Sequence, residues 1–194
     1  MKRICVFCGS SVGVRHGYRV AAREMATELC RRRLGVVYGG GGVGLMGILA
    51  DEMIAQGGEI VGVIPRPLAT KELAHPGLTQ MHVVESMHER KALMASLVDG
   101  FVAMPGGMGT FEETLEVLTW SQLGIHRKPV GLLNVEGYYD GLLAMIAHAV
   151  EEGFVPREYR ALSMSAATPA SLLDLMEAWE PPPVRGRWLN LTQS

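Results

Sequence analysis

Two glycine-rich stretches decide the fold class of this chain: Val36-Val-Tyr-Gly-Gly-Gly-Gly-Val-Gly-Leu-Met-Gly47 and Phe101-Val-Ala-Met-Pro-Gly-Gly-Met-Gly-Thr110. Each joins a short apolar run, typical of a buried strand, to a segment with helical periodicity. Glycine lets the backbone of such a junction approach a ligand, and the N–H groups at a helix start favour an anion. The alternative is that these glycines only allow close packing of helix on sheet.

The same alternation of apolar runs and helical segments continues along the chain, which predicts successive βα units and a doubly wound, mainly parallel sheet with helices on both faces. Residues 1–180 are expected to form one domain, and residues 181–194, which begin with three prolines, a C-terminal arm or disordered tail. We expect strands near residues 3–8, 36–38, 60–64, 81–84, 101–104 and 130–133, and helices near 18–33, 45–53, 86–98, 110–123, 138–151 and 168–179.

Composition restricts the function classes. The chain has 194 residues, of which 48% are hydrophobic, enough for one substantial core. Its net charge of −2 provides no basic field for a nucleic-acid polymer. No stretch approaches the roughly 18 apolar residues of a membrane helix, so we expect a cytoplasmic protein without a membrane partner.

Three other features are interpreted as structural. Cys5 and Cys8 lie in the first apolar run and are predicted to be buried strand residues rather than a redox pair. The histidines are scattered without ligand spacing, so no metal site is predicted. The run Arg31-Arg32-Arg33 is interpreted as a solvated helix end, where positive charge suits the helix dipole.

Neither glycine stretch contains the Gly-Lys-Ser/Thr of a P-loop, which disfavours phosphoryl transfer with Mg²⁺. Residues 39–44 do contain Gly-x-Gly-x-x-Gly, which would suit an NAD-dependent oxidoreductase. The acidic residue at the required distance is Glu59, however, and it heads a predicted strand instead of ending one. We therefore discount the dinucleotide interpretation.

Candidate reactive side chains follow two strands, Arg90 and Lys91 at the start of one helix and Glu112 and Glu113 at the start of another. Cleavage of an N-glycosidic bond creates positive charge on the ribose, which a carboxylate stabilises while it orients the attacking water. An arginine fork can hold that carboxylate or a sugar phosphate. Spacing alone favours a different role, because Thr110-x-x-Glu113 is also a capping box.

Two motifs give the chain a family resemblance. Pro105-Gly-Gly-Met-Gly-Thr-Phe-Glu-Glu113 fits the pattern P-G-G-x-G-T-x-x-E, and Met87-His-Glu-Arg-Lys91 fits M-H-x-R-K, both found in the LOG phosphoribohydrolases. The likeness spans about residues 4–143. Further stretches agree in the same order: Cys8-Gly-Ser-Ser11, Gly39-Gly-Gly41, Gly44-Leu-Met-Gly47, Thr119-Trp120, Gln122-Leu-Gly-Ile-His126 and Lys128-Pro-Val-Gly-Leu-Leu-Asn134. Position 42 departs from the pattern, with glycine where relatives often carry serine.

The resemblance implies a Rossmann-like fold, a single nucleotide-binding catalytic domain and a homodimer with active sites near the subunit interface. It implies hydrolysis of a purine nucleoside 5′-monophosphate to free base and ribose 5-phosphate, without metal or organic cofactor. Arg90 and Glu113 would be the catalytic pair, and Glu72, in the loop of residues 65–79, would contact base or ribose. The other substrate-binding positions implied are Ser10, Gly40, Gly41, Lys91, Gly106, Gly107, Met108, Gly109, Thr110, Glu112 and Thr119.

Several alternatives stay open at this point. The base could be an N6-prenylated adenine, as in cytokinins, or plain adenine, as in an AMP nucleosidase. A noncatalytic nucleotide or pterin-cofactor carrier would use similar glycine turns. Proteins of this family have also been labelled lysine decarboxylases, which the sequence supports poorly, because a chain of 194 residues is small for a pyridoxal enzyme.

Overall fold

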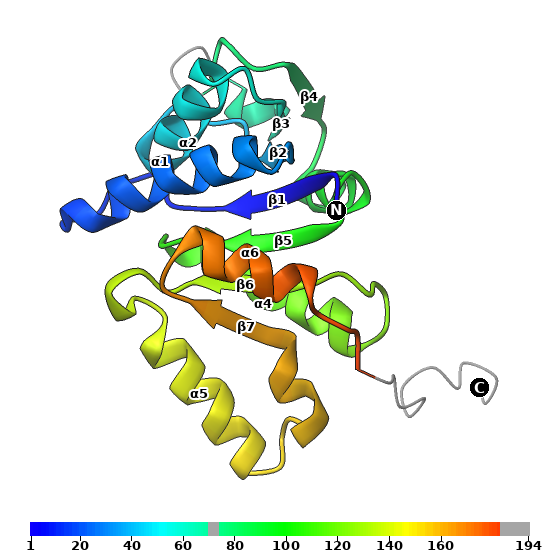
Figure 1. Ribbon diagram of the computed structural model, residues 1–194. Helices are drawn as coiled ribbons and strands as arrows, with labels where there is room; N and C mark the ends of the chain where they lie inside the picture. The colour runs from blue at the N-terminus through cyan, green and yellow to red at the C-terminus, as the bar shows by residue number, and fades with distance from the viewer. Residues whose placement is uncertain (70–73, 183–194) are drawn as a thin grey trace.

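The computed structural model describes residues 1–69 and 74–182, and within them seven strands form one sheet (Figure 1). All neighbouring strands run parallel, in the order β4-β3-β2-β1-β5-β6-β7. This confirms the doubly wound α/β prediction. The strands are β1 (Arg3–Phe7), β2 (Gly35–Tyr38), β3 (Ile60–Pro65), β4 (Gln80–Val84), β5 (Gly100–Ala103), β6 (Val130–Leu133) and β7 (Ser163–Ala166).

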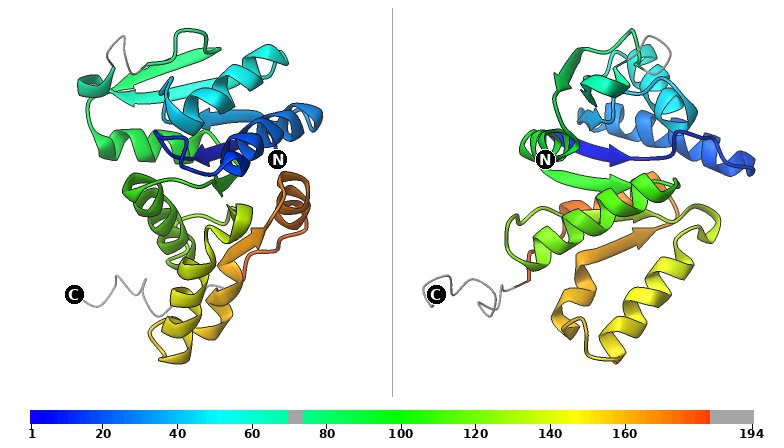
Figure 2. Two further views of the ribbon diagram at one scale, coloured as in Figure 1. Left: turned by 90° about the vertical axis from the view of Figure 1, so that its left-hand side faces the viewer. Right: turned by 180° about the vertical axis from the view of Figure 1, so that it is seen from behind.

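Helices cover both faces of the sheet, as Figures 1 and 2 show. One face carries α1 (His16–Arg31), α2 (Gly44–Ala55) and α6 (Pro169–Glu177). The other carries α3 (Met87–Ser96), α4 (Met108–Gln122) and α5 (Asp140–Glu151). Short 3₁₀ turns lie at Arg66–Leu68, Val135–Gly137 and Arg157–Leu162.

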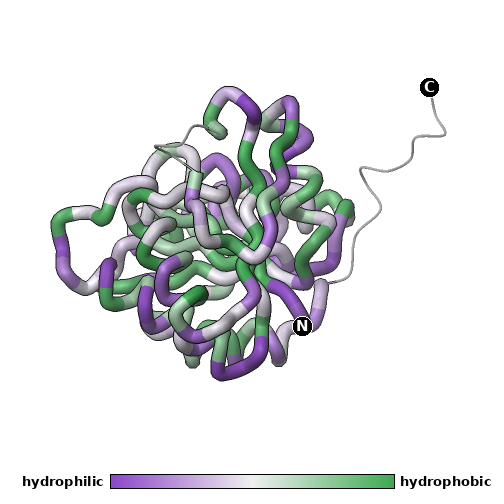
Figure 3. Tube along the Cα trace, turned by 90° about the horizontal axis from the view of Figure 1, so that it is seen from above, coloured by the Kyte–Doolittle hydropathy of each residue, from purple (hydrophilic) through white to green (hydrophobic). Residues whose placement is uncertain are grey.

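The strand pleat divides the core into two layers. In β1, Ile4 and Val6 pack beneath α1 and α2, whereas Cys5 and Phe7 pack beneath α3 and α4. Because helices cover both faces, the central strands are apolar at nearly every position, and the chain turns hydrophilic toward its outer loops and helix ends (Figure 3). Strand β7 was missed by the sequence analysis, because its run Ser-Met-Ser-Ala is only partly buried at the sheet edge.

The two cysteines are confirmed as buried free thiols, and burial raises the pKa of both. The solvated interpretation of the arginine run is wrong for Arg32. Its side chain is only 11% exposed and pairs with Glu28 at 2.7 Å and with Asp174 at 2.6 Å, so it ties α1 to α6. No helix among the described residues is long and apolar enough to cross a bilayer.

Helix starts differ along the chain. Ser86 caps α3 and Thr168 caps α6, since the side-chain oxygen of each accepts a backbone N–H of the helix that follows. Helix α4 instead begins after Gly107, and Thr110 lies inside it. The expected capping box of Thr110 and Glu113 is therefore wrong: an N-cap residue must precede the first helical turn, and Thr110 does not.

The order of the sheet also fixes where a ligand would bind. The chain builds outward from β1 through β2 to β4, and then returns to place β5 on the other side of β1. In open α/β sheets, ligands bind outside the carboxyl ends of the strands at such a switch point. The segments that follow β1 and β5 here are Cys8-Gly9-Ser10 and Met104-Pro105-Gly106-Gly107.

Candidate active site

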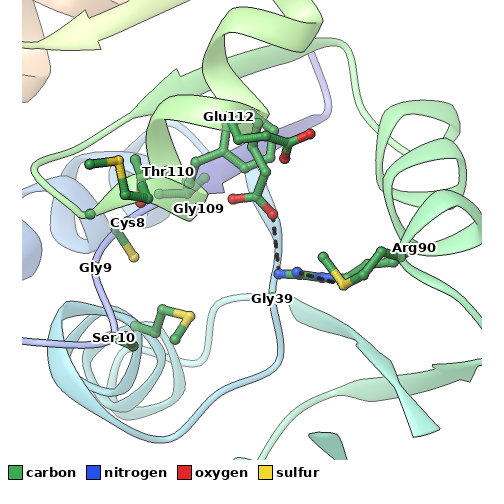
Figure 4. A pocket seen from close by; sticks show the side chains of 15 residues that line it. Cys8, Gly9, Ser10, Gly39, Arg90, Gly109, Thr110 and Glu112 are labelled. Carbon is green, nitrogen blue, oxygen red and sulfur yellow. Dashed lines mark hydrogen bonds and ion pairs between the residues drawn. The ribbon is translucent and has the colours of Figure 1, made fainter. Parts of the chain in front are cut away.

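A pocket of about 290 Å³ opens at this switch point (Figure 4). Its wall comes from five places in the chain: the end of β1 with Gly9 and Ser10, the end of β2 at Gly39, Met46 of α2, one side of α3, and the first turns of α4. Segments far apart in the sequence thus meet at the carboxyl ends of the central strands. The segments after β1, β2 and β5 come together there because these three strands are parallel neighbours in the sheet.

The start of α4 is open toward this pocket. Gly107 is its N-cap residue, and in the part of the chain that the structure describes the backbone N–H groups of Met108, Gly109 and Thr110 have no hydrogen-bond partner. A Cβ built on Gly107 or Gly109 would meet no described atom within 4 Å, and neither residue has a positive φ. Packing and backbone strain therefore do not explain these glycines. The turn leaves free donors and free space at the positive end of a helix dipole, which suits an anion.

The start of α2 is closed. The N–H groups of Leu45 and Met46 both donate to the carbonyl oxygen of Gly9, at 2.9 and 3.4 Å. Gly44 has φ +64°, and a Cβ there would lie 2.2 Å from the carbonyl carbon of Ser10. The sequence predicted two open helix starts, and for the N–H groups of Leu45 and Met46 the prediction is wrong. Gly44 serves packing against the β1–α1 loop, as the alternative interpretation held.

Arg90 reaches the pocket from α3. Its Nε donates to the carbonyl oxygen of Val63 in β3 at 3.1 Å, and its Nη2 lies 3.3 Å from Oε1 of Glu113. The Arg90 side chain is 13% exposed. Figure 4 shows it pointing from its helix across the pocket toward the start of α4, with a dashed line marking the ion pair. The structure thus brings together the two residues that the resemblance implies as a catalytic pair.

Glu113 is a buried carboxyl group with spare hydrogen-bonding capacity. Its side chain is 10% exposed, and its Oε1 has no hydrogen-bond partner among the described residues, although Arg90 faces it. Burial raises the pKa of Glu113, Arg90 opposes that rise, and Glu112 adds to it. An acceptor held in a low-dielectric pocket beside a single guanidinium is arranged to stabilise developing positive charge or to orient a hydroxyl.

Lys91 and Thr119 do not line the pocket. The ammonium group of Lys91 pairs with Glu112 at 2.6 Å and with Glu116 at 2.9 Å, which ties α3 to α4 just behind the site. Burial alone would lower the pKa of Lys91, but its hydrogen bonds to the two glutamates outweigh that effect and raise it. The Thr119 hydroxyl donates to the carbonyl oxygen of Leu115 on the exposed side of α4. Substrate binding by either residue stays a prediction.

The other predicted binding residues divide between the pocket and its surroundings. Gly106 and Gly41 each line an adjoining chamber, whereas Gly40, with φ +76°, packs against Met81. Glu72 lies outside the described residues. The predicted residues that line the pocket are Ser10, Gly107, Met108, Gly109, Thr110, Glu112 and, with the catalytic role, Arg90 and Glu113.

Two tyrosines at this site were missed by the sequence analysis. The hydroxyl of Tyr139 donates to the carbonyl oxygen of Met104 at 2.7 Å, and that of Tyr138 to the carbonyl oxygen of Gly106. They therefore hold both ends of the turn that leads into α4. Burial raises the pKa of Tyr139. The available signal was a tandem pair of tyrosines soon after a buried strand.

Comparison with known proteins identifies relatives of this chain. The family model described as "Possible lysine decarboxylase" matches residues 46–176. A probable cytokinin riboside 5′-monophosphate phosphoribohydrolase of Oryza sativa subsp. japonica, LOGL5, is 50% identical over 191 residues, which cover 98% of this chain and 78% of the relative. The cytokinin riboside 5′-monophosphate phosphoribohydrolase LOG2 of Arabidopsis thaliana is 50% identical over 180 residues, covering 93% and 84%.

Solved structures share the fold at lower identity. The molybdenum cofactor binding protein of Rippkaea orientalis superposes with a TM-score of 0.69 at 18% identity, covering 92% of this chain and 97% of that chain. The molybdenum cofactor carrier protein of Chlamydomonas reinhardtii gives 0.68 at 20%, covering 91% and 96%. At these identities the likeness extends to the fold alone.

Proposed function

Because this chain belongs to the LOG family of phosphoribohydrolases, whose family model bears the description "Possible lysine decarboxylase", we propose that it hydrolyses N6-modified adenine nucleoside 5′-monophosphates. The products are a free cytokinin base and ribose 5-phosphate. One observation carries the proposal: the buried carboxylate of Glu113, with an oxygen free to accept, faces Arg90 beside an open helix start.

We assign the 5′-phosphate to the start of α4, where the N–H groups of Met108, Gly109 and Thr110 are free to donate. A charge-assisted hydrogen bond contributes about 1.5–3 kcal/mol, so a few of them account for selective binding of a monophosphate. The empty space beside Gly107 and Gly109 lets phosphate oxygens approach the backbone. The ribose would then lie over the pocket, within reach of Glu113.

The bond-breaking step follows from the charges. As the bond from C1′ to the base nitrogen breaks, its electron pair leaves with the base and positive charge develops on the ribose. Glu113 stabilises that charge and orients a water, whose oxygen bonds to C1′. The proton that the water loses balances the proton that the departing base gains. Arg90 faces the carboxylate and favours its ionised form, because its guanidinium opposes the rise in the Glu113 pKa that burial causes.

A chamber next to Arg90 supports a modified adenine over a plain one. It holds about 310 Å³ and is lined largely by apolar side chains, among them Val43, Ile64, Pro65 and Leu68. An apolar substituent on N6 of the base would lose water-exposed surface there, at about 25 cal/mol per Å². Hydrolysis of unmodified AMP is the alternative substrate preference, and the rate ratio of the two nucleotides decides between them.

The lysine decarboxylase description does not suit Lys91, which lies next to the pair of Arg90 and Glu113. Chemistry through a pyridoxal Schiff base needs a lysine amine that loses its proton readily. Lys91 is held by two carboxylates that raise its pKa, which favours the charged ammonium. This charge environment therefore disfavours Schiff-base chemistry at Lys91.

The family resemblance also suggests a homodimer, which stays a proposal, as does the cytoplasmic location expected from the sequence. For the dimer, the measurement is mass by light scattering at micromolar concentration together with activity. A fully active monomer would contradict it.

The direct test of the function is incubation with N6-isopentenyladenosine 5′-monophosphate, AMP and adenosine, with release of free base followed by chromatography. We expect release from the prenylated monophosphate first. Binding of all three without any release would leave a noncatalytic nucleotide carrier as the better description.

A further inference from the structure

Gly39 directly follows β2 and lines the pocket. The space that a side chain on Gly39 would fill is occupied by the side chain of Arg90. A Cβ on Gly39 would lie 2.4 Å from Nη2 of Arg90 and 3.5 Å from its Cζ. The backbone of Gly39 does not have a positive φ, so an alanine could adopt its conformation. Glycine suits this position because any larger side chain would collide with the guanidinium of Arg90.

The guanidinium of Arg90 is enclosed on its other sides. Nε is held by the carbonyl oxygen of Val63 at 3.1 Å, Nη1 lies 3.8 Å from the sulfur of Met87, and Nη2 faces Glu113 at 3.3 Å. Gly39 closes the remaining side with backbone instead of a side chain. The position of the charge thus depends on the space above Gly39.

We propose that Gly39 is a positioning residue, which sets the distance between the Arg90 guanidinium and the Glu113 carboxylate by leaving room for Nη2. Its catalytic consequence rests on the proposed function, whereas the placement itself can be tested without a substrate. The neighbouring glycines have different reasons. Gly40 and Gly44 have positive φ, and a Cβ on Gly42 would make only ordinary contact, with its nearest atom the Cα of His75 at 3.5 Å.

The substitution Gly39→Ala is expected to keep the fold. The atom that meets the new methyl group is the far end of a flexible side chain, so the arginine moves before the backbone does. Since a displacement of about 1 Å at a reacting group costs on the order of 10²-fold in rate, we expect kcat to fall by about 10- to 100-fold. The KM for the monophosphate should change by less than about threefold, since the free N–H groups of α4 are untouched.

The Glu113 carboxylate gives a readout that needs no turnover. Its pKa should rise in Gly39→Ala, because the guanidinium that lowers it is farther away. The measurement is a ¹³C NMR titration of glutamate carboxyls, with Glu113→Gln to assign the signal. Gly42→Ala is the matched control and should leave this pKa unchanged. The charged and titratable groups coupled to Glu113 are Arg90, Lys91, Glu112, Glu116, Cys5 and Cys8.

A double-mutant cycle separates placement of Arg90 from any general effect of a methyl group. With Arg90→Ala, the nearest remaining neighbour of the new Cβ is the sulfur of Met46 at 3.4 Å. Gly39→Ala should then change neither Tm nor residual turnover further. Equal effects in both backgrounds, or an unchanged Glu113 pKa in the single variant, would overturn the proposal. A raised Glu113 pKa in a protein that hydrolyses no nucleotide would uphold the placement and reject the proposed function.

Discussion

The two glycine-rich turns look alike in sequence and behave differently in the structure. Both follow a central parallel strand and precede a helix. At the start of α2, Gly9 accepts the N–H groups of Leu45 and Met46, and Gly44 packs against Ser10. At the start of α4, the N–H groups are free and two glycines face empty space. A glycine turn at a strand end can thus offer donors to an anion only where neighbouring backbone leaves them unused.

The largest effect should separate a nucleotide from its nucleoside. If the open turn binds the 5′-phosphate through two or more charge-assisted hydrogen bonds of about 1.5–3 kcal/mol each, kcat/KM for adenosine compounds lacking the phosphate should fall by about 10² or more. Base release from the prenylated nucleoside and its monophosphate is the measurement. Comparable rates would show that the open turn is not a phosphate site.

The next effect concerns the carboxylate beneath the open turn. Glu113→Gln should reduce turnover by about 10², equivalent to roughly 2.7 kcal/mol, because an amide cannot stabilise a cationic ribose. Tm should be almost unchanged. In the wild type, burial raises the pKa of Glu113, so activity should be lost as pH falls through a value above the usual one for glutamate. A variant that keeps half of the wild-type turnover would remove Glu113 from the mechanism.

One pair of alanine substitutions tests the comparison directly, because the change in folding stability is expected to have opposite signs in the two turns. Gly44→Ala should lower stability by about 1–3 kcal/mol, since its φ of +64° and the adjacent Ser10 backbone both resist a side chain. Gly109→Ala should raise stability by about 0.5–1 kcal/mol, because alanine favours the helix. It should also weaken nucleotide binding by placing a methyl group in the open space. Thermal unfolding with and without AMP measures both, and destabilisation by Gly109→Ala would contradict the open-turn description.

The smallest effect is expected at Tyr139, which supports the open turn from behind. Tyr139→Phe removes the hydrogen bond to the carbonyl oxygen of Met104 in a buried position, which should cost about 1–2 kcal/mol of folding free energy. The KM for the monophosphate should rise modestly, and kcat should change little because Glu113 is untouched. Denaturant unfolding reports the stability, and an unchanged midpoint would mean that the turn is held by its other contacts.

The sequence was sufficient for much of this fold, because the pattern that identifies a parallel α/β sheet is local. Apolar runs such as Val130–Leu133 and the caps Ser86 and Thr168 are visible in a few adjacent residues. Edge strand β7 lacks that pattern, since a half-buried strand needs fewer apolar side chains. Arg32 also looks solvated until α6 is packed beside it.

The candidate site was predictable in its residues and not in its geometry. The motifs marked Arg90 and Glu113, and a resemblance was enough to pair them. Whether Glu113 caps its helix depends on where α4 begins, and the turn after β5 sets that start at Gly107. Whether α2 offers free donors depends on Gly9, which lies in the loop after β1. Both features depend on contacts between distant parts of the chain, so residue spacing alone does not predict them.

Gly9 joins the two turns through a single residue: its N–H donates to the carbonyl oxygen of Pro105, and its carbonyl accepts from the start of α2. Because one residue makes both hydrogen bonds, a change that moves either turn should also move the other. Variation in substrate preference is then expected in the chamber next to Arg90, at Val43, Ile64 and Leu68, whose side chains take no part in these backbone hydrogen bonds. A library randomised at those three positions should yield altered base selectivity far more often than one randomised around Gly9.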